Sequence, residues 1–357
     1  MIPLFKVFMP NEVSIGIADI LNSGHLAYGT HTKNFETKLR EYVSNKNILA
    51  ISGNSVLFAL RLIGIKAEDE VIVSPMSCLM TTQPIAVVGA KVVWADIDPM
   101  TGSLDPEDVK KKITSKTKAI VHYHWAGYPG YIDEINAIAK EHCIYVIEDA
   151  TESFGAEYNG EKLGNNGTDI VCYSFTPVRL PNAIDGGGVA FKSKELFDKA
   201  VLMRDLGIDR SKFRDSLGEI SELCDISTFG DSATMNNVSG YVGVTQMDYL
   251  DKLYNTQRTN AKKWQEYFSD NKEITLLNTR NNTNPSYWAF TILSNNRDEL
   301  LQKFRNNGFY ASKMHLRNDL YSVFKSSAKD FKGINEFSNK QLNLPCGWWI
   351  NNEDILK

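Results

Sequence analysis

Three acidic side chains follow one short apolar segment and are the first candidates for chemistry. The segment Ile144–Ile147 has the composition of a buried strand, and Glu148, Asp149 and Glu152 come next along the chain. Surface acids are usually solvated and inert, whereas acids at the end of a buried strand are more often partnered. The pattern favours a group of carboxylates at the mouth of a sheet, with an inert solvated surface as the alternative.

A helix start with small polar residues is a second place for a ligand. Gly53, Asn54 and Ser55 follow the strand-like Ile48–Ser52 and lead straight into a helical pattern. The free backbone N–H groups and the dipole of such a helix start attract an anion. A plain N-cap by Asn54 or Ser55 explains the same residues without a ligand.

A third place is the stretch Tyr173–Gly188, which ends in three consecutive glycines. It precedes the strand-like Val189–Phe191. Glycines permit positive φ and close approach of the backbone. A flexible turn is the alternative explanation.

The elements that position these residues alternate along the first half of the chain. Short β-branched runs are separated by segments with the 3.6-residue apolar spacing of helices, such as Ser55–Ile65 and Ile132–His142. This alternation predicts an α/β fold with a mostly parallel central sheet, whose carboxyl-terminal edge collects ligands. The predicted strands are Ile48–Ser52, Glu70–Ser74, Lys91–Ala95, Ala119–His122, Ile144–Glu148 and Ile170–Ser174.

The pattern changes after the glycines. A helix is predicted at Lys194–Leu206, a polar and mobile surface loop at Asp209–Thr228, and one or two long helices at Asn236–Phe268. We expect a domain boundary near Leu250. The division is a large cofactor-binding type of domain over residues 1–250 and a smaller C-terminal α/β domain over 251–357.

Composition and charge exclude several classes of protein. The net charge of −4 over 357 residues comes without a basic block, so we expect no nucleic-acid partner. Five widely spaced cysteines suit reduced thiols in a cytosol. No apolar run reaches the length of a membrane span, so we expect a soluble, cytoplasmic protein. His122 and His124 are expected to face opposite sides of a strand, and no metal site is predicted.

Several of these segments together resemble the DegT/StrS sugar aminotransferases. The resemblance implies the aspartate aminotransferase fold (fold type I), bound pyridoxal phosphate, a homodimer and amination of keto sugars on nucleotides. It spans nearly the whole chain. The segments that carry it are Glu148–Ala156, Ser174–Arg179, Asp185–Gly188, Ile2–Leu4, Tyr28–Gly29, Phe35–Glu36, Asp96–Pro99, Arg204–Gly207, Met235–Val238 with Gly243 and Gln246, and Cys346–Trp349.

The resemblance also implies roles for single residues. Asp149 matches the acid that pairs with the pyridine nitrogen of the cofactor, and Glu152 matches the acid or amide beside its 3-hydroxyl. Ser174 matches the phosphate-binding hydroxyl, with backbone N–H groups near Gly53, Asn54 and Ser55. Cys78 stands where the family has a ring-stacking aromatic. His315 falls in the segment on the substrate side, and His124 and Trp125 follow the fourth strand closely enough for substrate contact.

The chain departs from the family at the residue that matters most. Five residues after the phosphate-binding serine, the family has the Schiff-base lysine, and this chain has Arg179. A guanidinium is neither a nucleophile toward an aldehyde nor a proton shuttle, but it still binds anions. The family's asparagine and arginine that reach across the dimer are replaced by Ser232 and Thr234. Pyridoxal phosphate or pyridoxamine phosphate, if bound, is therefore expected to be non-covalent, and the alternative is no cofactor.

Three hypotheses follow from this departure. The chain acts on a nucleotide sugar with Asp149, Glu152 and His315 as acid–base groups, or it is an inactive pseudoenzyme or partner subunit that kept the fold and pocket. The third is that Arg179 is an engineered or variant replacement, against which the changes at Ser232 and Thr234 argue. An unpaired buried carboxylate is unfavourable, so the presence of Asp149 favours a bound ligand, with an ion pair to Arg179 as the structural alternative.

Overall fold

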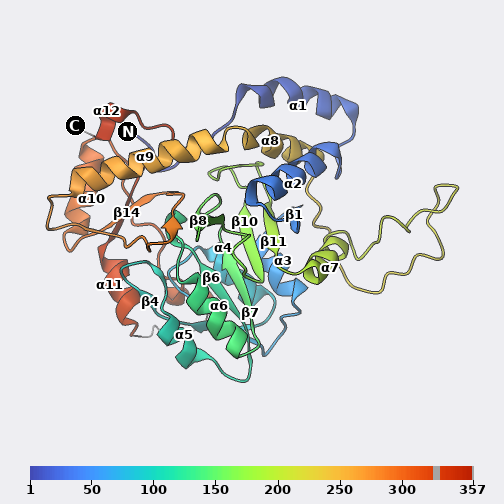
Figure 1. The fold of residues 1–357 in the computed structure, drawn as a ribbon, viewed down its shortest axis with the longest axis horizontal. Coiled ribbons are helices and arrows are strands. Elements are labelled where there is room, and N and C mark those ends of the chain that lie inside the picture. The colour runs from blue at the N-terminus through green and yellow to red at the C-terminus, as the bar shows by residue number, and fades with distance from the viewer. Residues whose placement is uncertain (325–329, 356–357) are drawn as a thin grey trace.

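A seven-stranded sheet forms the centre of the molecule (Figure 1). The computed structural model describes residues 1–324 and 330–355. The strand order is β1-β11-β10-β7-β6-β2-β3, and every neighbouring pair is parallel except the two pairs made by β11. The strands are β1 (Ile48–Ile51), β2 (Glu70–Val73), β3 (Lys91–Trp94), β6 (Thr117–Tyr123), β7 (Tyr145–Asp149), β10 (Ile170–Ser174) and β11 (Gly187–Phe191). The predicted α/β class with a mostly parallel sheet is confirmed.

The glycine run is explained by the tight fit of β11 between two strands. Gly186 has a φ of 90°, and a Cβ there would lie 2.4 Å from the carbonyl oxygen of Ile51. A Cβ on Gly187 would lie 2.4 Å from the carbonyl oxygen of Tyr173. The glycines therefore allow close backbone approach at the carboxyl ends of β1 and β10, rather than forming a flexible turn.

Helices cover both faces of this sheet. On one face, α3 contacts β7, β10 and β11, and on the other α6 contacts β6 and β7 while α2 contacts β1. Both faces bury apolar side chains, as parallel sheets require. The helices of this part are α1 (Asn11–Ser23), α2 (Thr30–Val43), α3 (Ser55–Leu62), α4 (Leu79–Val87), α5 (Pro106–Lys112), α6 (Ile132–Glu141), α7 (Lys194–Arg204) and α8 (Asn237–Met247), with a short 3₁₀ turn at Trp125–Gly127.

A smaller unit follows from the long helix α9 (Leu250–Phe268) onward. Its antiparallel sheet has the order β12-β14-β15. Its elements are β12 (Thr275–Leu276), β14 (Phe290–Leu293), α10 (Arg297–Asn306), α11 (Lys332–Lys340), β15 (Gln341–Leu344) and α12 (Asn352–Ile355), with 3₁₀ turns at Asn318–Leu320 and Ser322–Phe324. Peripheral ribbons complete the fold: β4 (Ile97–Asp98) with β5 (Ser103–Leu104), and β8 (Glu157–Tyr158) with β9 (Glu161–Lys162) and β13 (Thr283–Asn284).

The N-terminal segment crosses the domain division expected from the sequence. The backbone N–H of Ile2 donates to Gly308 O at 2.6 Å, and Tyr310 N donates to Ile2 O at 2.9 Å. The Phe5 ring stacks on Trp288 with centroids 3.9 Å apart. The first residues therefore pack against the C-terminal unit, because their apolar side chains find cover there.

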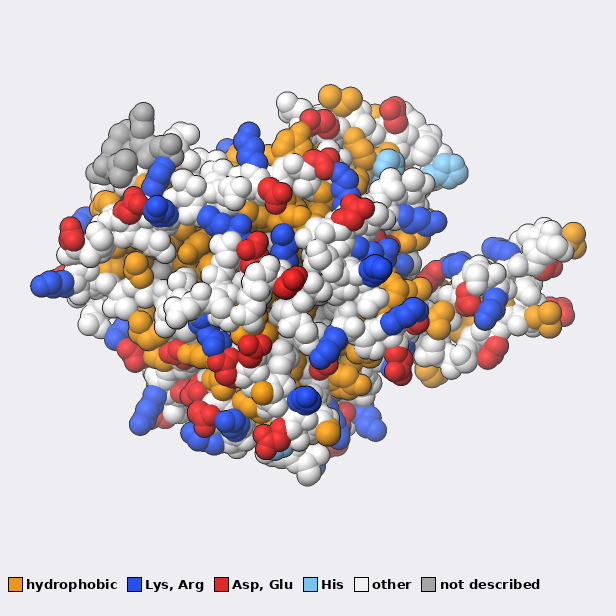
Figure 2. Space-filling model, in the orientation of Figure 1, with side chains coloured by type: hydrophobic (Ala, Val, Ile, Leu, Met, Phe, Trp, Pro, Cys, Tyr) orange, Lys and Arg blue, Asp and Glu red, His pale blue; other side chains and the backbone are white. Residues whose placement is uncertain are grey.

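The predicted polar loop is a projecting arm. Residues 209–229, which we call the arm, extend away from the body of the molecule beyond α7 (Figure 1). Its apolar side chains are exposed, with Leu217 at 84%, Leu223 at 94% and Phe229 at 101% of full exposure, and apolar atoms mark its surface in Figure 2. The arm therefore leaves apolar surface without cover from its own chain.

Candidate functional site

The parallel strands β6 and β7 place two different sets of side chains on their two faces. His122 pairs in register with Glu148, and Tyr123 pairs with Asp149. Because side chains alternate along a strand, each pair shares a face. Asp149 is the last residue of β7, while Glu148 faces the opposite layer. The sequence-based grouping of Glu148 with Asp149 and Glu152 at the mouth of the sheet is therefore wrong for Glu148.

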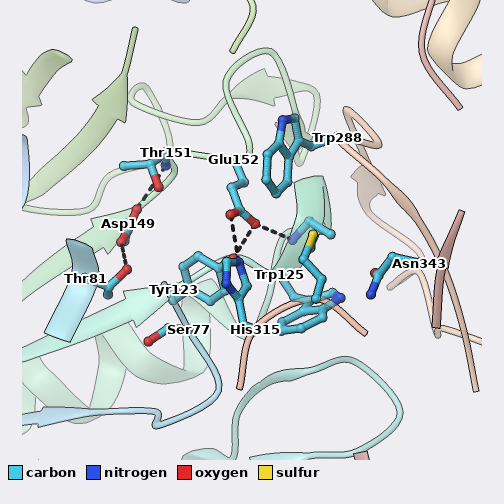
Figure 3. Close-up of polar contacts among 12 residues, drawn as sticks. Ser77, Thr81, Tyr123, Trp125, Asp149, Thr151, Glu152, Trp288, His315 and Asn343 are labelled. Carbon is cyan, nitrogen blue, oxygen red and sulfur yellow. Dashed lines mark hydrogen bonds and ion pairs between the residues drawn. The ribbon is translucent and has the colours of Figure 1, made fainter. Parts of the chain in front are cut away.

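Asp149 is a buried carboxylate held by uncharged donors. Thr81, in the first turn of α4, donates from Oγ1 to Asp149 Oδ2 at 2.5 Å, and Thr151 N donates to Oδ1 at 3.0 Å (Figure 3). Within the described part of the chain, no cation lies at ion-pair distance from it. Burial raises the pKa of Asp149 above its usual range despite these hydrogen bonds. A bound cation would therefore be stabilised here.

Glu152 lies close by but has charged partners. Its carboxylate accepts from Tyr123 Oη, from His315 Nε2 at 3.0 Å and from Ala126 N at 3.3 Å. Arg179 Nη2 lies 3.5 Å from Oε1. Burial works to raise the pKa of Glu152, but His315, Arg179 and Tyr123 together hold it below its usual range. Glu152 therefore remains an acceptor with His315 as its proton-bearing neighbour.

Arg179 is fixed by stacking and only partly satisfied. Its guanidinium lies over the Trp288 ring, 3.9 Å from the centroid, and Trp288 Nε1 donates to Val178 O at 2.9 Å. Nε and Nη1 of Arg179 are buried and have no hydrogen-bond partner among the residues that the structure describes. The ion pair of Arg179 is with Glu152, so the alternative of a structural pair with Asp149 is wrong. The reason is that Trp288 holds the guanidinium on the Glu152 side.

Six of the eight predicted cofactor-binding residues line one cavity that is partly open to solvent, and Asp149 and Glu152 are not among its lining residues. Asn54 caps α3 by accepting from Leu57 N at 2.8 Å, and its amide donates to Met80 O at 2.8 Å. Ser174 ends β10, with Oγ 3.0 Å from Thr176 Oγ1. Gly53 turns into the helix with a φ of 77°. The residues that line this cavity, which we call the inner cavity, include Gly53, Asn54, Ser55, Cys78, Thr151, Ser174 and Arg179.

A second pocket, partly open to solvent, adjoins the first. The two share Thr151 and Arg179, so Arg179 stands at their junction. Glu152 also lines the second cavity, which we call the outer cavity, together with Phe5, Lys6, Trp288 and Trp348. Six of its fourteen lining side chains are aromatic and two are basic, which suits a ligand with flat and anionic parts.

A family comparison agrees with the fold and covers nearly the whole chain. A profile of the DegT/DnrJ/EryC1/StrS aminotransferase family matches residues 11–357. The chain belongs to this family.

Individual members of the family match over almost their full length. GDP-perosamine synthase of Vibrio cholerae is 26% identical, with 97% of this chain and 94% of that protein covered. The dTDP-3-amino-3,4,6-trideoxy-alpha-D-glucose transaminase of Streptomyces venezuelae is 25% identical, with 97% and 90% covered. The crystal structure of the sugar aminotransferase CalS13 from Micromonospora echinospora superimposes with a TM-score of 0.93 at 26% identity, covering 100% of this chain and 97% of that one.

Two predicted substrate contacts lie in the interior. His124 is fully buried, with Nδ1 accepting from Gly130 N at 3.1 Å and Nε2 3.1 Å from Glu148 Oε2. Trp125 is also fully buried, and its Nε1 donates to Thr291 Oγ1 at 3.0 Å. Their polar atoms are already used within the chain, so neither offers one to a substrate in this conformation. Trp125 does contact the His315 ring, with centroids 5.7 Å apart.

His122 lies in β6, and His124, one residue beyond the end of this strand, lies beside it. Their ring centroids are 4.8 Å apart, so the expectation of opposite faces was wrong, because residues two apart in a strand point the same way. Among the described residues, no group of three or more His, Cys, Asp or Glu is arranged to hold a metal ion. Over the same part of the chain, no helix is both long and apolar enough to cross a membrane.

Three contributors to the site were not foreseen from the sequence. Thr81 sits in a helix without a recognisable motif, and Phe5 and Trp288 lie far from the strand ends along the chain. Their roles depend on tertiary contacts. Trp288 could be recognised only from its contact with Arg179, which is visible once the fold is known.

Proposed function

We propose that this chain binds a nucleotide sugar and a vitamin B6 phosphate without a covalent bond between protein and cofactor. Arg179 takes the position of the family's lysine, so amino transfer would proceed without a lysine at this position. The observation that carries the proposal is Asp149, a buried carboxylate with hydroxyl and backbone donors but no cationic partner within the described residues.

The residues present fit the cofactor as a non-covalent ligand. A pyridinium nitrogen would supply the cation that Asp149 lacks. The start of α3 and Ser174 offer N–H and O–H donors at one end of the inner cavity, which suits a phosphate. Members of this family use pyridoxal phosphate. When bound, the cofactor supplies an electron-withdrawing ring that labilises bonds on an attached amine carbon.

The protein groups have distinct parts in this proposal. Asp149 holds the ring nitrogen protonated, and Thr81 orients its carboxylate. Glu152 and His315 share a hydrogen bond and move a proton at His315 Nε2. Arg179 only donates, because a guanidinium stays protonated at working pH. Tyr123 fixes the second oxygen of Glu152.

The outer cavity supports a nucleotide sugar as substrate. Its flat walls, including Trp288 and Trp348, suit a sugar or base, and Lys6 with Arg179 suits a diphosphate. Two relatives are named for GDP- and dTDP-linked sugars, which makes the same substrate class reasonable for this chain.

The chain is also proposed to form a homodimer. The uncovered apolar side chains of the arm, such as Leu223 and Phe229, support this because such surface is normally covered. Sedimentation velocity of the full chain measures the assembly, and a monomer at micromolar concentration would contradict it.

A pseudoenzyme is the second candidate function. A guanidinium cannot attack an aldehyde, so the assignment of Arg179 to the lysine position supports a loss of turnover by the family's usual route. The pocket and dimer surface would then serve binding or partnership. Ligand binding without amino transfer is the result that separates this candidate from the first.

The test is a thermal-shift and calorimetry screen of the full chain with pyridoxal phosphate, pyridoxamine phosphate and several nucleotide sugars. Binding raises stability by about 2.7 kcal/mol at a hundredfold excess over Kd, which is visible as a higher Tm. Asp149→Asn removes the partner of the ring nitrogen, and we expect at least about thirtyfold weaker binding of the B6 phosphates. Glu148→Gln, on the opposite face of the same strand, is the matched control and should leave Kd unchanged. No shift with any ligand would refute the proposal.

A further inference from the structure

The junction between the two cavities holds two hydrogen-bond donors without acceptors. Arg179 Nε and Nη1 are buried and unpaired, while the single ion-pair contact of the guanidinium is Nη2 to Glu152 at 3.5 Å. A buried N–H without an acceptor is destabilising. Arg179 is also the one basic side chain among the residues that line the inner cavity. The site therefore lacks an acceptor that a ligand must supply.

The guanidinium is held in one orientation, which makes it a defined recognition element. Trp288 lies 3.9 Å from the guanidinium carbon and is itself stacked on Phe5 at 3.9 Å, with planes 14° apart. Arginine presents its donors as a planar fork that matches two neighbouring acceptor atoms. A ligand with two adjacent oxygens in one plane is the best partner for it.

We propose that Arg179 makes the inner cavity selective for the aldehyde form of vitamin B6 phosphate over the amine form. The aldehyde form carries a phenolate oxygen and a carbonyl oxygen on adjacent ring carbons, which is a planar pair of acceptors. The inference rests on the proposed function, because it concerns the ligand that Asp149 and Ser174 are proposed to hold.

The amine form lacks the second acceptor. Its aminomethyl group is an ammonium, which only donates hydrogen bonds and repels a permanent cation. The ammonium also hydrogen-bonds to the phenolate oxygen of the same ring, and this oxygen is then less available as an acceptor for Arg179. Glu152 attracts an ammonium, but its oxygens already accept from Tyr123, His315 and Ala126.

The family's lysine in the same place would react with the aldehyde, whereas Arg179 would only bind it. The preference for the aldehyde form would therefore serve to retain the cofactor, which differs from catalysis by a lysine. The chain would retain the cofactor in its oxidised form and keep the carbonyl unreacted until an amine enters from the outer cavity.

The experiment measures Kd by calorimetry for four ligands that differ only at the 4-position of the ring. They are pyridoxal phosphate (aldehyde), pyridoxine phosphate (hydroxymethyl), 4-deoxypyridoxine phosphate (methyl) and pyridoxamine phosphate (aminomethyl). We expect the aldehyde to bind at least about tenfold tighter than the aminomethyl ligand, because it adds a charge-assisted hydrogen bond. The methyl ligand, which has no acceptor at this position, should fall between them. Treatment with borohydride followed by mass spectrometry confirms that the aldehyde complex is non-covalent.

Variants assign the preference to Arg179. Arg179→Met keeps an unbranched apolar side chain and removes the guanidinium, and the ratio of the aldehyde and amine Kd values should fall close to one. Arg179→Gln, which retains donors without the charge, should show an intermediate ratio. Arg210→Met, on the exposed arm, is the control and should keep the wild-type ratio. Thermal unfolding of each variant shows whether it folds.

Each outcome is decisive. Equal binding of the aldehyde and amine forms, tighter binding of the amine form, or a preference that persists in both Arg179 variants would overturn the inference and leave the proposed function intact. Absence of binding by all four ligands would refute the proposed function, and the inference with it. A borohydride-trapped adduct on any lysine would overturn both.

Discussion

Glu148 and Asp149 are adjacent in β7 and equally buried, yet they have opposite surroundings. Glu148 accepts from Asn166 Nδ2 at 2.8 and 3.0 Å, from His124 Nε2 at 3.1 Å and from Thr168 Oγ1. Within the described part of the chain, Asp149 accepts only from Thr81 and Thr151. The carboxylate of Glu148 has its hydrogen-bond partners within the chain, whereas the carboxylate of Asp149 can accept further hydrogen bonds.

This difference shows that burial of an acid does not by itself mark a binding site. Both side chains are removed from water and both need partners. What separates them is whether the chain supplies those partners. The face with Glu148 packs against α6 and serves the fold, while the face with Asp149 is the one that we propose to bind a ligand.

The largest expected effect on the free energy of unfolding comes from the face of β7 that carries Glu148. Glu148→Gln turns one acceptor atom into a donor that faces the donors of Asn166, Thr168 or His124. We expect a loss of about 1–3 kcal/mol in the free energy of unfolding, measured by urea denaturation. Asp149→Asn should lose less or gain stability, because burial already disfavours its carboxylate. A larger loss for Asp149→Asn would reverse the assignment of the two faces.

A second effect concerns acid stability of the same face. Burial, with the neighbouring His124, holds the pKa of His122 well below its usual range. The unfolded chain therefore binds a proton near pH 6.5 that the folded chain refuses, so stability is present above this pH and is lost as the pH falls. The slope is up to about 1.4 kcal/mol per pH unit.

His122→Gln tests this assignment. The variant keeps a polar atom near Ser103, whose Oγ lies 2.8 Å from His122 Nε2. Urea unfolding between pH 7 and 5 should show a flatter dependence on pH than the wild type. If the dependence of the unfolding free energy on pH were unchanged, groups other than His122 would be responsible for the acid sensitivity.

The smallest expected effect lies on the Asp149 face. Thr81→Val removes the hydroxyl that donates to Asp149 Oδ2 and keeps the size of the side chain. This should raise the pKa of Asp149 further and weaken binding of pyridoxal phosphate at neutral pH by about 0.5–1.5 kcal/mol. Calorimetry over a range of pH should show the loss of binding on acidification at a higher pH in the variant. Thr82→Val, at the next position, is the control for the fold.

The alternating pattern was enough to predict the strands and the fold class. Each of the six predicted strands overlaps a strand of the central sheet, because β-branched runs between helical segments are locally encoded. The faces were harder: Glu148 was placed at the mouth of the sheet, and His122 was separated from His124. Adjacent residues of a strand face opposite sides, which separates Glu148 from Asp149. Residues two apart face the same side, which brings His122 and His124 together.

Tertiary partners lie beyond what a local pattern encodes. Arg179 could be singled out from its position in a motif, but its unpaired N–H groups and its ion pair with Glu152 could not. Trp288 packs on Arg179, and Phe5 stacks on Trp288, only because segments far apart in the sequence pack together. Roles that depend on such contacts follow from geometry rather than from spacing along the chain.

The stacking of Phe5 on Trp288 has a consequence for how the protein is made. During synthesis from the ribosome, the first residues wait until nearly the whole chain has emerged before their partners in the last third exist. The wall beside Arg179 is consequently completed late, and a nascent chain that is released early would carry an open pocket.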